Sequence, residues 1–541
     1  MENRVVTRSS RGGAAAGLSR RQVLGSGALL AVAATGLVDP RPSIAQSAAP
    51  LGAPQPFDFE VLKQKAKALA AKAHVAPKPV APGEIGKIDF DVVQKISFRA
   101  EKALWKDGPG PFPVRFFHVN KFNPLSVRIN VLAGGLARRV PYSAQDFDYG
   151  STGLDKKIPG DIGFSGFRVM NGENEATDWL AFQGASYFRS AGQDNQYGAS
   201  ARGIAVNTSA STKEEFPLFT EFWLAEPNPD KREIVIYALL DGPSLTGAYK
   251  FIASRKSGAV MDVAAALYIR HDIARLGIAP LTSMYWYGEN DRQFATDWRP
   301  EIHDNDGLDL WTGKGERIWR PLINPTSVQT NSFLDENPKG FGLMQRDRRF
   351  ANYQDDGAFY NRRPSIWVEP LNDWGAGAVQ LVEIPTRDEI HDNIVAYWTP
   401  KKPVKAGDEI NIAYRLYWQN NHPHPPTDIA RVVATRIGHG GVPGSPASTD
   451  KDSWKFVIDF VGGPLSAMAP RFDLKPEVNV SRGKVTNAYV VKVVGTDQWR
   501  VAFDVHAPGK QQIDLRCYLR HEGMTLTETW LYQFFPPGSA T

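Results

Sequence analysis

The sequence has little material for covalent cross-links or for membrane spans. One cysteine, Cys517, occurs in 541 residues, so no disulfide can form within the chain, and a zinc site built from several cysteines is excluded. Cys517 alternates with Ile513 and Leu515 as in a strand, and we interpret it as a buried, inert thiol. Beyond residue 45 no apolar run is a transmembrane candidate, so we expect a protein that does not span the membrane.

The chain also lacks a strong charge of one sign. The formal net charge of +5 comes mainly from residues 1–45, which carry six arginines against two acidic residues. The rest of the chain has 57 basic and 56 acidic residues, a net charge of +1, and no dense basic stripe. This balance gives no electrostatic case for nucleic acid, so we expect no such partner.

The N-terminal 45 residues have the features of an export signal. The paired arginines Arg20 and Arg21 precede an apolar run over residues 28–38, and a small-x-small cleavage pattern ends at Ala45. The apolar run is too short to span a bilayer, which argues against a membrane anchor. The pattern therefore predicts a twin-arginine signal peptide over residues 1–45, cleaved after Ala45, and a periplasmic location.

The remaining chain predicts an all-β protein. Residues 46–56 are rich in alanine and proline and are predicted to be disordered, and residues 57–75 show the apolar spacing of a helix. From about residue 113, short β-rich segments alternate with turns of glycine, proline and asparagine. This spacing predicts one large antiparallel β-sandwich within residues 57–420, because the long helices of a parallel α/β sheet are missing.

A second, smaller β domain is predicted after a linker. Residues 421–428 contain His422 and His424 among prolines, and no nearby carboxylate or cysteine set completes a metal site. Residues 429–541 contain seven short β-rich segments, a number typical of an immunoglobulin-like sandwich. We expect this domain to support or bind rather than to catalyse, since it has no concentrated acid/base set.

Two acidic loops of the large sandwich are the candidates for chemistry. Residues 298–311 hold four carboxylates, a histidine and two tryptophans, and residues 388–392 form a second acidic cluster before a strand. Tryptophan stacks on the apolar face of a sugar, and carboxylates bind its hydroxyls or exchange protons with the glycosidic oxygen. A solvated acidic turn is the alternative for each loop, because Asp-Asn-Asp-Gly is itself a good turn sequence.

Other chemistries find no support in the residues. There is no Gly-x-Ser-x-Gly elbow and no dinucleotide-binding fingerprint at the start of a helix. Residues 313–315 (Gly-Lys-Gly) lack the spacing of a phosphate-binding loop, and we expect neither a metal nor a cofactor. The residues are compatible with a glycoside hydrolase and with a carbohydrate-binding surface, and by themselves favour neither.

The leader, the two β domains and a set of local motifs together resemble the MdoG/OpgG family of periplasmic glucan proteins, and within it the D branch. The twin-arginine leader favours that branch, because the other main branch usually carries a general secretory signal. The resemblance covers about residues 57–535 and rests on segments 184–189, 197–198, 200–203, 213–217, 245–251, 277–284, 302–304, 337–342, 363–370 and 528–533.

The resemblance implies a fold and a function. The fold is a large sandwich similar to galactose mutarotase, followed by an immunoglobulin-like domain, and the role is in making osmoregulated periplasmic glucans with a β-1,2-linked glucose backbone. Family members look like inverting endo-β-1,2-glucanases, whose general acid falls on Asp392 and whose general base falls on Asp304. Inverting enzymes hold these carboxyls about 6.5–9.5 Å apart, or further if a water chain or a sugar hydroxyl relays the proton.

The resemblance also suggests binding partners. It leaves a non-catalytic glucan-binding factor, acting with a membrane glucosyltransferase, as the alternative to an enzyme, and it leaves open a homodimer. The predicted glucan contacts are Trp286, Tyr287, Arg346, Tyr353, Arg363 and Trp367.

Overall fold

The computed structural model describes residues 51–537 apart from residues 109, 173, 443 and 445–449. The predicted signal peptide and residues 46–50 lie outside this part of the chain. Residues 51–56 differ from the predicted disorder, because strand β1 (Gln55–Pro56) pairs with β5 (Leu136–Arg139) and the Gly52 N–H donates to the Arg139 carbonyl at 2.9 Å. In the described residues, no helix has the length and apolar character needed to cross a membrane.

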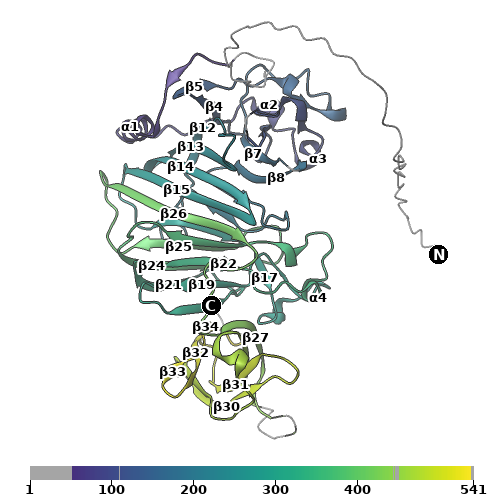
Figure 1. Ribbon diagram of the computed structural model, residues 1–541, viewed down its shortest axis with the longest axis vertical. Helices are drawn as coiled ribbons and strands as arrows, with labels where there is room; N and C mark the ends of the chain where they lie inside the picture. The colour runs from purple at the N-terminus through teal and green to yellow at the C-terminus, as the bar shows by residue number, and fades with distance from the viewer. Residues whose placement is uncertain (1–50, 109, 173, 443, 445–449, 538–541) are drawn as a thin grey trace, which may run out of the picture. The chain divides into compact units, whose positions relative to one another are not determined.

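The regular secondary structure of the described chain is mostly β-strand, as predicted, and most of the strands form two large sheets (Figure 1). The larger sheet has 16 strands, in the spatial order β1, β5, β4 (Arg128–Ala133), β12 (Leu218–Ala225), β13 (Glu233–Asp241), β14 (Leu245–Lys256), β15 (Gly258–Ile269), β26 (Glu409–Gln419), β23 (Ser365–Pro370), β22 (Gly340–Met344), β19 (Gly307–Trp311), β20 (Arg317–Pro321), β34 (Thr529–Phe534), β32 (Ile513–His521) and β29 (Lys475–Val480), with β33 (Met524–Thr525) beside β32.

The smaller of the two sheets has ten strands. Its order is β21 (Gln329–Glu336), β24 (Ala376–Glu383), β25 (Ile394–Pro400), β16 (Leu276–Ser283), β10 (Ser200–Arg202), β9 (Tyr187–Ser190), β8 (Asn174–Gln183), β7 (Gly166–Asn171) and β3 (Val114–Phe117), with β11 (Ile204–Val206) also on β16. Two strand pairs stand apart, β17 (Tyr285–Tyr287) with β18 (Ile302–His303) and β2 (Ser97–Phe98) with β6 (Phe147–Asp148).

Aromatic and aliphatic side chains from both sheets form one core. Phe182 on β8 and Phe251 on β14 meet across the layers with ring centroids 5.2 Å apart, and Phe188 on β9 packs against Trp418 on β26 at 6.2 Å. Alternate residues of each strand point to this core, because successive side chains of a strand face opposite sides of the sheet. The predicted β-sandwich is therefore confirmed.

Within the described residues, α-helices are few and short. They are α1 (Phe59–Ala70), α2 (Pro82–Ile85), α3 (Phe90–Val93) and α4 (Phe350–Tyr353). The helix predicted within residues 57–75 is confirmed as α1, which begins after Asp58, whose carboxylate caps the Val61 N–H at 2.8 Å. Its buried residues Leu62 and Ala66 pack on the larger sheet beside Trp223.

One prediction of local structure was wrong. The sequence of residues 271–276 predicts one helical turn, but Ile273 makes a β-bridge to Val404 and β16 begins at Leu276. Every residue of β16 is buried, so the strand lacks the alternation that reveals a half-exposed strand in a sequence.

The seven strands predicted after residue 429 are all present. Four of them form a separate sheet in the order β27 (Arg431–His439), β28 (Ser453–Val461), β31 (Trp499–His506) and β30 (Lys484–Lys492). The other three are β29, β32 and β34, and β34 pairs in parallel with β20, so they continue the larger sheet. We call strands β27 to β34 the C-terminal sandwich; the immunoglobulin-like assignment stays a prediction.

The predicted linker packs closely on the larger sheet. The His422 ring lies 4.1 Å from the Trp367 ring, centroid to centroid. Burial and the nearby charges of Arg317 and Arg346 lower the pKa of His422 to about 3, so the imidazole is neutral. Within the described residues, no group of histidine, cysteine and acidic side chains has the arrangement needed to hold a metal ion.

Candidate functional site

Asp304 lies directly after β18, and the fold buries it. The Asp304 N–H donates to the Met284 carbonyl at 2.9 Å, which ties the residue to the start of β17. Its side chain is 6% exposed, and its carboxylate accepts a hydrogen bond from the Arg363 guanidinium. Residues 298–311, which show no regular period in sequence, thus form one short strand before Asp304 and β19 after it.

Asp392 lies on the loop between β24 and β25, and the next residue fixes the base of that loop. The side-chain amide of Asn393 donates to the carbonyls of Tyr285 and Ile384, both at 2.9 Å, and accepts from the Tyr285 N–H at 2.8 Å. Tyr285 belongs to β17, the partner of β18. A single buried amide therefore joins the Asp392 loop to the hairpin that carries Asp304.

The protein disfavours the charged form of both carboxyls. Burial raises the pKa of Asp304, although the Arg363 charge acts against this shift. For Asp392, loss of hydration and the nearby charge of Asp304 raise the pKa to about 6. Asp392 nevertheless keeps contact with solvent, so it can exchange its proton. The charge of Asp304 thus acts on Asp392 across the two loops.

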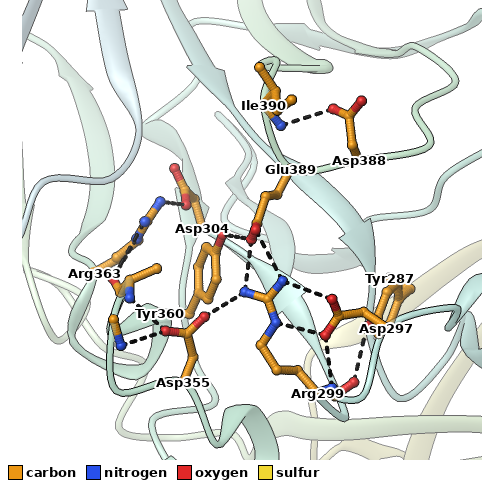
Figure 2. Close-up of polar contacts among 12 residues, drawn as sticks. Tyr287, Asp297, Arg299, Asp304, Asp355, Tyr360, Arg363, Asp388, Glu389 and Ile390 are labelled. Atoms are coloured by element: carbon orange, nitrogen blue, oxygen red, sulfur yellow. Dashed lines mark hydrogen bonds and ion pairs between the residues drawn. The ribbon is translucent and has the colours of Figure 1, made fainter. Parts of the chain in front are cut away.

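A network of charges connects the two loops (Figure 2). Glu389, on the Asp392 loop, accepts two hydrogen bonds of 3.0 Å from Arg299 and one from the Tyr360 hydroxyl. The Tyr360 ring in turn lies 4.2 Å from the Arg363 guanidinium, which binds Asp304. The Asp392 loop is thereby clamped to the segment that carries Asp304.

Arg299 is itself held by two more carboxylates. Asp297 accepts from its Nε at 2.9 Å, and Asp355 accepts from its Nη1 at 2.5 Å (Figure 2). Three acidic partners around one guanidinium favour its charged form and raise its pKa, although burial acts in the opposite direction. Arg299 is therefore a fixed cation between the two loops.

Three of the predicted glucan contacts lie close to this site. Trp286 is half-buried on β17, and its ring meets the Tyr287 ring edge-on at 5.2 Å. Tyr287 is buried, and its hydroxyl donates to the Arg299 carbonyl at 3.0 Å. Arg363 joins them through its contact with Asp304.

The other three predicted contacts lie in the interior. Tyr353 is 0% exposed and Trp367 is 1% exposed. The Arg346 side chain is 7% exposed and makes ion pairs with Asp309 and Glu528. A direct contact between these side chains and a glucan stays a prediction, and the structure offers it almost no accessible surface.

Sequence reasoning gave no role to several residues of the site. The charge of Arg189, at the end of a motif that carries the family resemblance, lowers the pKa of Asp392. The buried Thr282 hydroxyl has no partner of strict hydrogen-bond geometry, yet it acts in the same direction on Asp392. The sequence indicates a role for Tyr360 and Arg299 only through their position near predicted site residues, because their roles arise from contacts between distant segments.

The arrangement provides a proton donor and a proton acceptor of different character. Asp392 is accessible, and its raised pKa keeps part of the population protonated in mildly acidic solution. Asp304 is enclosed, and although burial raises its pKa, its contact with Arg363 acts in the opposite direction and favours the carboxylate. Such a pair can exchange two protons with a bound molecule at separate points, which is what acid/base hydrolysis needs.

Comparisons with known proteins agree on one family. Residues 57–534 match the family model described as "Periplasmic glucan biosynthesis protein, MdoG". The chain is 48% identical over 490 residues to glucans biosynthesis protein D of Stenotrophomonas maltophilia (strain R551-3), covering 90% of this chain and 91% of the relative. It is 46% identical over 533 residues to glucans biosynthesis protein D 2 of Ralstonia nicotianae, covering 96% and 98%.

Proposed function

Because the chain belongs to the MdoG family of periplasmic glucan biosynthesis proteins, we propose that it is an inverting endo-β-1,2-glucanase that shapes the glucan backbone. Asp392 is the general acid and Asp304 is the general base. The observation that carries this proposal is the convergence of two carboxyls with raised pKa from separate loops, one accessible and one enclosed. Shifted carboxyl pKa values of this kind gather at sites of acid/base chemistry.

In the proposed reaction, Asp392 gives its proton to the glycosidic oxygen as the bond from that oxygen to the anomeric carbon breaks. A water molecule attacks the anomeric carbon from the opposite face, and its proton passes to Asp304. One water is consumed, and the new hydroxyl has the inverted configuration. Asp392 then regains a proton from solvent, and Asp304 releases one.

The enclosure of Asp304 determines how its proton arrives. Its side chain is only 6% exposed and its carboxylate is bound to Arg363, so little of it is open to bulk water. We therefore assign the transfer to a relay through a water chain or a glucan hydroxyl. A relay also removes the need for the short carboxyl separation of a directly acting base.

Binding is assigned to the side chains that border the two loops. Trp286 offers a partly exposed aromatic face for the apolar side of a glucose ring. Arg363 can bond a glucose hydroxyl through the N–H groups that remain beyond its contacts with Asp304 and with the Ala358 carbonyl. The resemblance and the family name support a glucan as the ligand.

The test is incubation of the purified protein with linear β-1,2-glucan, with product length followed by chromatography and anomeric configuration by NMR. We expect shortened chains whose first-formed anomer is inverted, and loss of both signals in Asp392→Asn and Asp304→Asn. Asp388→Asn is the matched control, because Asp388 lies on the same loop and its carboxylate caps the Ile390 N–H at 2.9 Å (Figure 2).

A non-catalytic glucan-binding factor is the second candidate. The observation in its favour is the burial of Asp304, which withholds the base from solvent in the unbound protein. Glucan binding without any cleavage between pH 4 and pH 8 would establish this function and reject the hydrolase.

A further inference from the structure

The rear of the Asp304 segment faces the C-terminal sandwich. Three of its side chains, those of Glu301, His303 and Asp306, line a small cavity of about 30 Å³. Residues 432–435 of the C-terminal sandwich form the opposite wall. The segment thus has a front, where Asp304 meets Arg363, and a rear that contacts another part of the fold.

Asp306 anchors this segment to the chain around residue 346. Its carboxylate accepts hydrogen bonds from the Arg346 N–H at 3.0 and 3.1 Å and from the Asp347 N–H at 2.8 Å. Its own N–H donates to the Met344 carbonyl at 2.9 Å. Since Asp306 is only two residues from Asp304, the position of the Arg346 backbone constrains the base.

Arg346 is held from the C-terminal sandwich. Its guanidinium makes a bidentate contact with Glu528, at 2.7 and 3.0 Å, and donates to the Val432 carbonyl at 2.9 Å. It also pairs with Asp309 at 2.6 Å and lies 3.7 Å from the Trp319 ring. All of these contacts are made by the planar Arg346 guanidinium, so together they fix its orientation.

Glu528 has its second partner within the C-terminal sandwich. It accepts from the Val432 N–H at 3.0 Å, and its side chain is 0% exposed. Burying an ion pair costs hydration of both charges, so such pairs contribute little net stability, but breaking one partner leaves a costly unpaired charge. A buried bidentate pair instead fixes the relative orientation of its two side chains.

We propose that Glu528 is a positioning residue for the hydrolysis, acting from the C-terminal sandwich through Arg346 and Asp306 on the segment that carries Asp304. This inference rests on the proposed function for its catalytic consequence. It gives the C-terminal sandwich a role in aligning the base, beyond support of the fold. A displaced base slows the chemical step more than it weakens glucan binding, because the assigned binding residues Trp286 and Arg363 make no hydrogen bond to Glu528, Arg346 or Asp306 within the described residues.

The test compares Glu528→Gln with a matched variant, Glu316→Gln. Glu316 also joins the two parts of the fold, since it pairs with Arg516 at 2.9 Å and accepts from the Thr529 hydroxyl at 2.7 Å, but it is half-exposed and does not contact Arg346. We expect Glu528→Gln to lower kcat by about tenfold to a hundredfold with KM within about twofold of wild type. Glu316→Gln should leave both constants unchanged.

Hydrogen–deuterium exchange supplies a readout that needs no hydrolysis. We expect faster amide exchange at residues 302–308 and 344–348 in Glu528→Gln, and no change there in Glu316→Gln. If wild type does not cleave glucan, the proposed function fails, and exchange still decides whether Glu528 orders the Asp304 segment.

The proposal is overturned if Glu528→Gln lowers the melting temperature while kcat and exchange at residues 302–308 stay at wild-type values. Should Glu528→Gln not fold, Glu528→Asp carries the same test, because it keeps the charge and shortens the side chain by one methylene. An intermediate loss of kcat at constant KM supports the positioning role, and wild-type kcat in Glu528→Asp with unchanged exchange rejects it.

Discussion

Asp504 in the C-terminal sandwich and Asp392 in the large sandwich have opposite surroundings. Burial alone would raise the pKa of Asp504, but hydrogen bonds from Asn487 at 2.7 Å, Lys455 at 2.6 Å and the Gly441 N–H at 3.0 Å hold it below its usual value. Around Asp392 the loss of hydration and the Asp304 charge prevail, and the pKa rises to about 6.

This difference separates carboxylates that support the fold from those available for chemistry. A carboxylate with several donors is stabilised as an anion and gains nothing by moving a proton. A carboxyl whose charge is disfavoured is ready to hold a proton and release it when a substrate arrives. We therefore expect substitution of Asp392 to affect hydrolysis and substitution of Asp504 to affect the stability of the fold.

The largest expected effect is that of Asp392→Asn. Loss of a general acid should reduce hydrolysis of β-1,2-glucan by about 10²- to 10⁴-fold. The melting temperature should not fall, because the substitution removes a charge that the fold disfavours. Activity within about tenfold of wild type would contradict the assignment.

The converse change is Asp504→Ala. It leaves the Lys455 charge and two further donors without their partner, so we expect a loss of about 2–4 kcal/mol in the free energy of unfolding, measured with urea. The kcat of the folded fraction should match wild type. A large loss of kcat at wild-type stability would show that the two regions do not divide their roles as proposed.

The pH dependence should also differ between the two residues. Hydrolysis should fall about tenfold per pH unit above pH 6, as Asp392 loses its proton. Because its folded pKa is raised, the stability linked to Asp392 is present below its unfolded pKa and is lost as pH rises through about 6. For Asp504 the folded pKa is depressed, so its stability is present above the unfolded pKa and is lost in acid.

Unfolding curves collected from pH 3 to pH 8 check these signs. Asp392→Asn should gain stability relative to wild type as pH rises through 6, and Asp504→Ala should lose less stability on acidification than wild type. A pH–rate profile for hydrolysis without a decline on the alkaline side would reject Asp392 as the acid.

The smallest expected effect is that of Arg363→Met. The Arg363 charge lowers the pKa of Asp304, so its removal should raise that pKa and move the acidic limb of the pH–rate profile to higher pH. A shift of one unit corresponds to a loss of about tenfold in rate on the acidic limb. Arg362→Met is the matched control, because Arg362 is the exposed neighbour and has no contact with Asp304 among the described hydrogen bonds. If the acidic limb of the pH–rate profile does not shift in Arg363→Met, Arg363 does not control the pKa of Asp304.

Much of the fold could be predicted because the pattern of apolar side chains along a strand indicates which of its faces is buried. Many strands of both sandwiches alternate between core and surface, as β32 does from Ile513 to Leu519. β16 escaped this reasoning because both of its faces are buried. The acidic loops were identified by composition, but Arg346 and Trp367 were grouped with them as binding residues, and nothing local in the sequence reveals that both lie beneath other segments.

The sequence by itself determined the class of fold and the kinds of side chain available for chemistry, because the alternation of apolar residues reports which face of a strand is buried. Only the tertiary structure decided which charges meet. Asp304 binds an arginine 59 residues away, and Arg346 binds a glutamate 182 residues away. The pKa values of Asp304 and Asp392 depend on the loss of hydration and on nearby charges such as that of Arg363, and no property of the isolated loops contains that information.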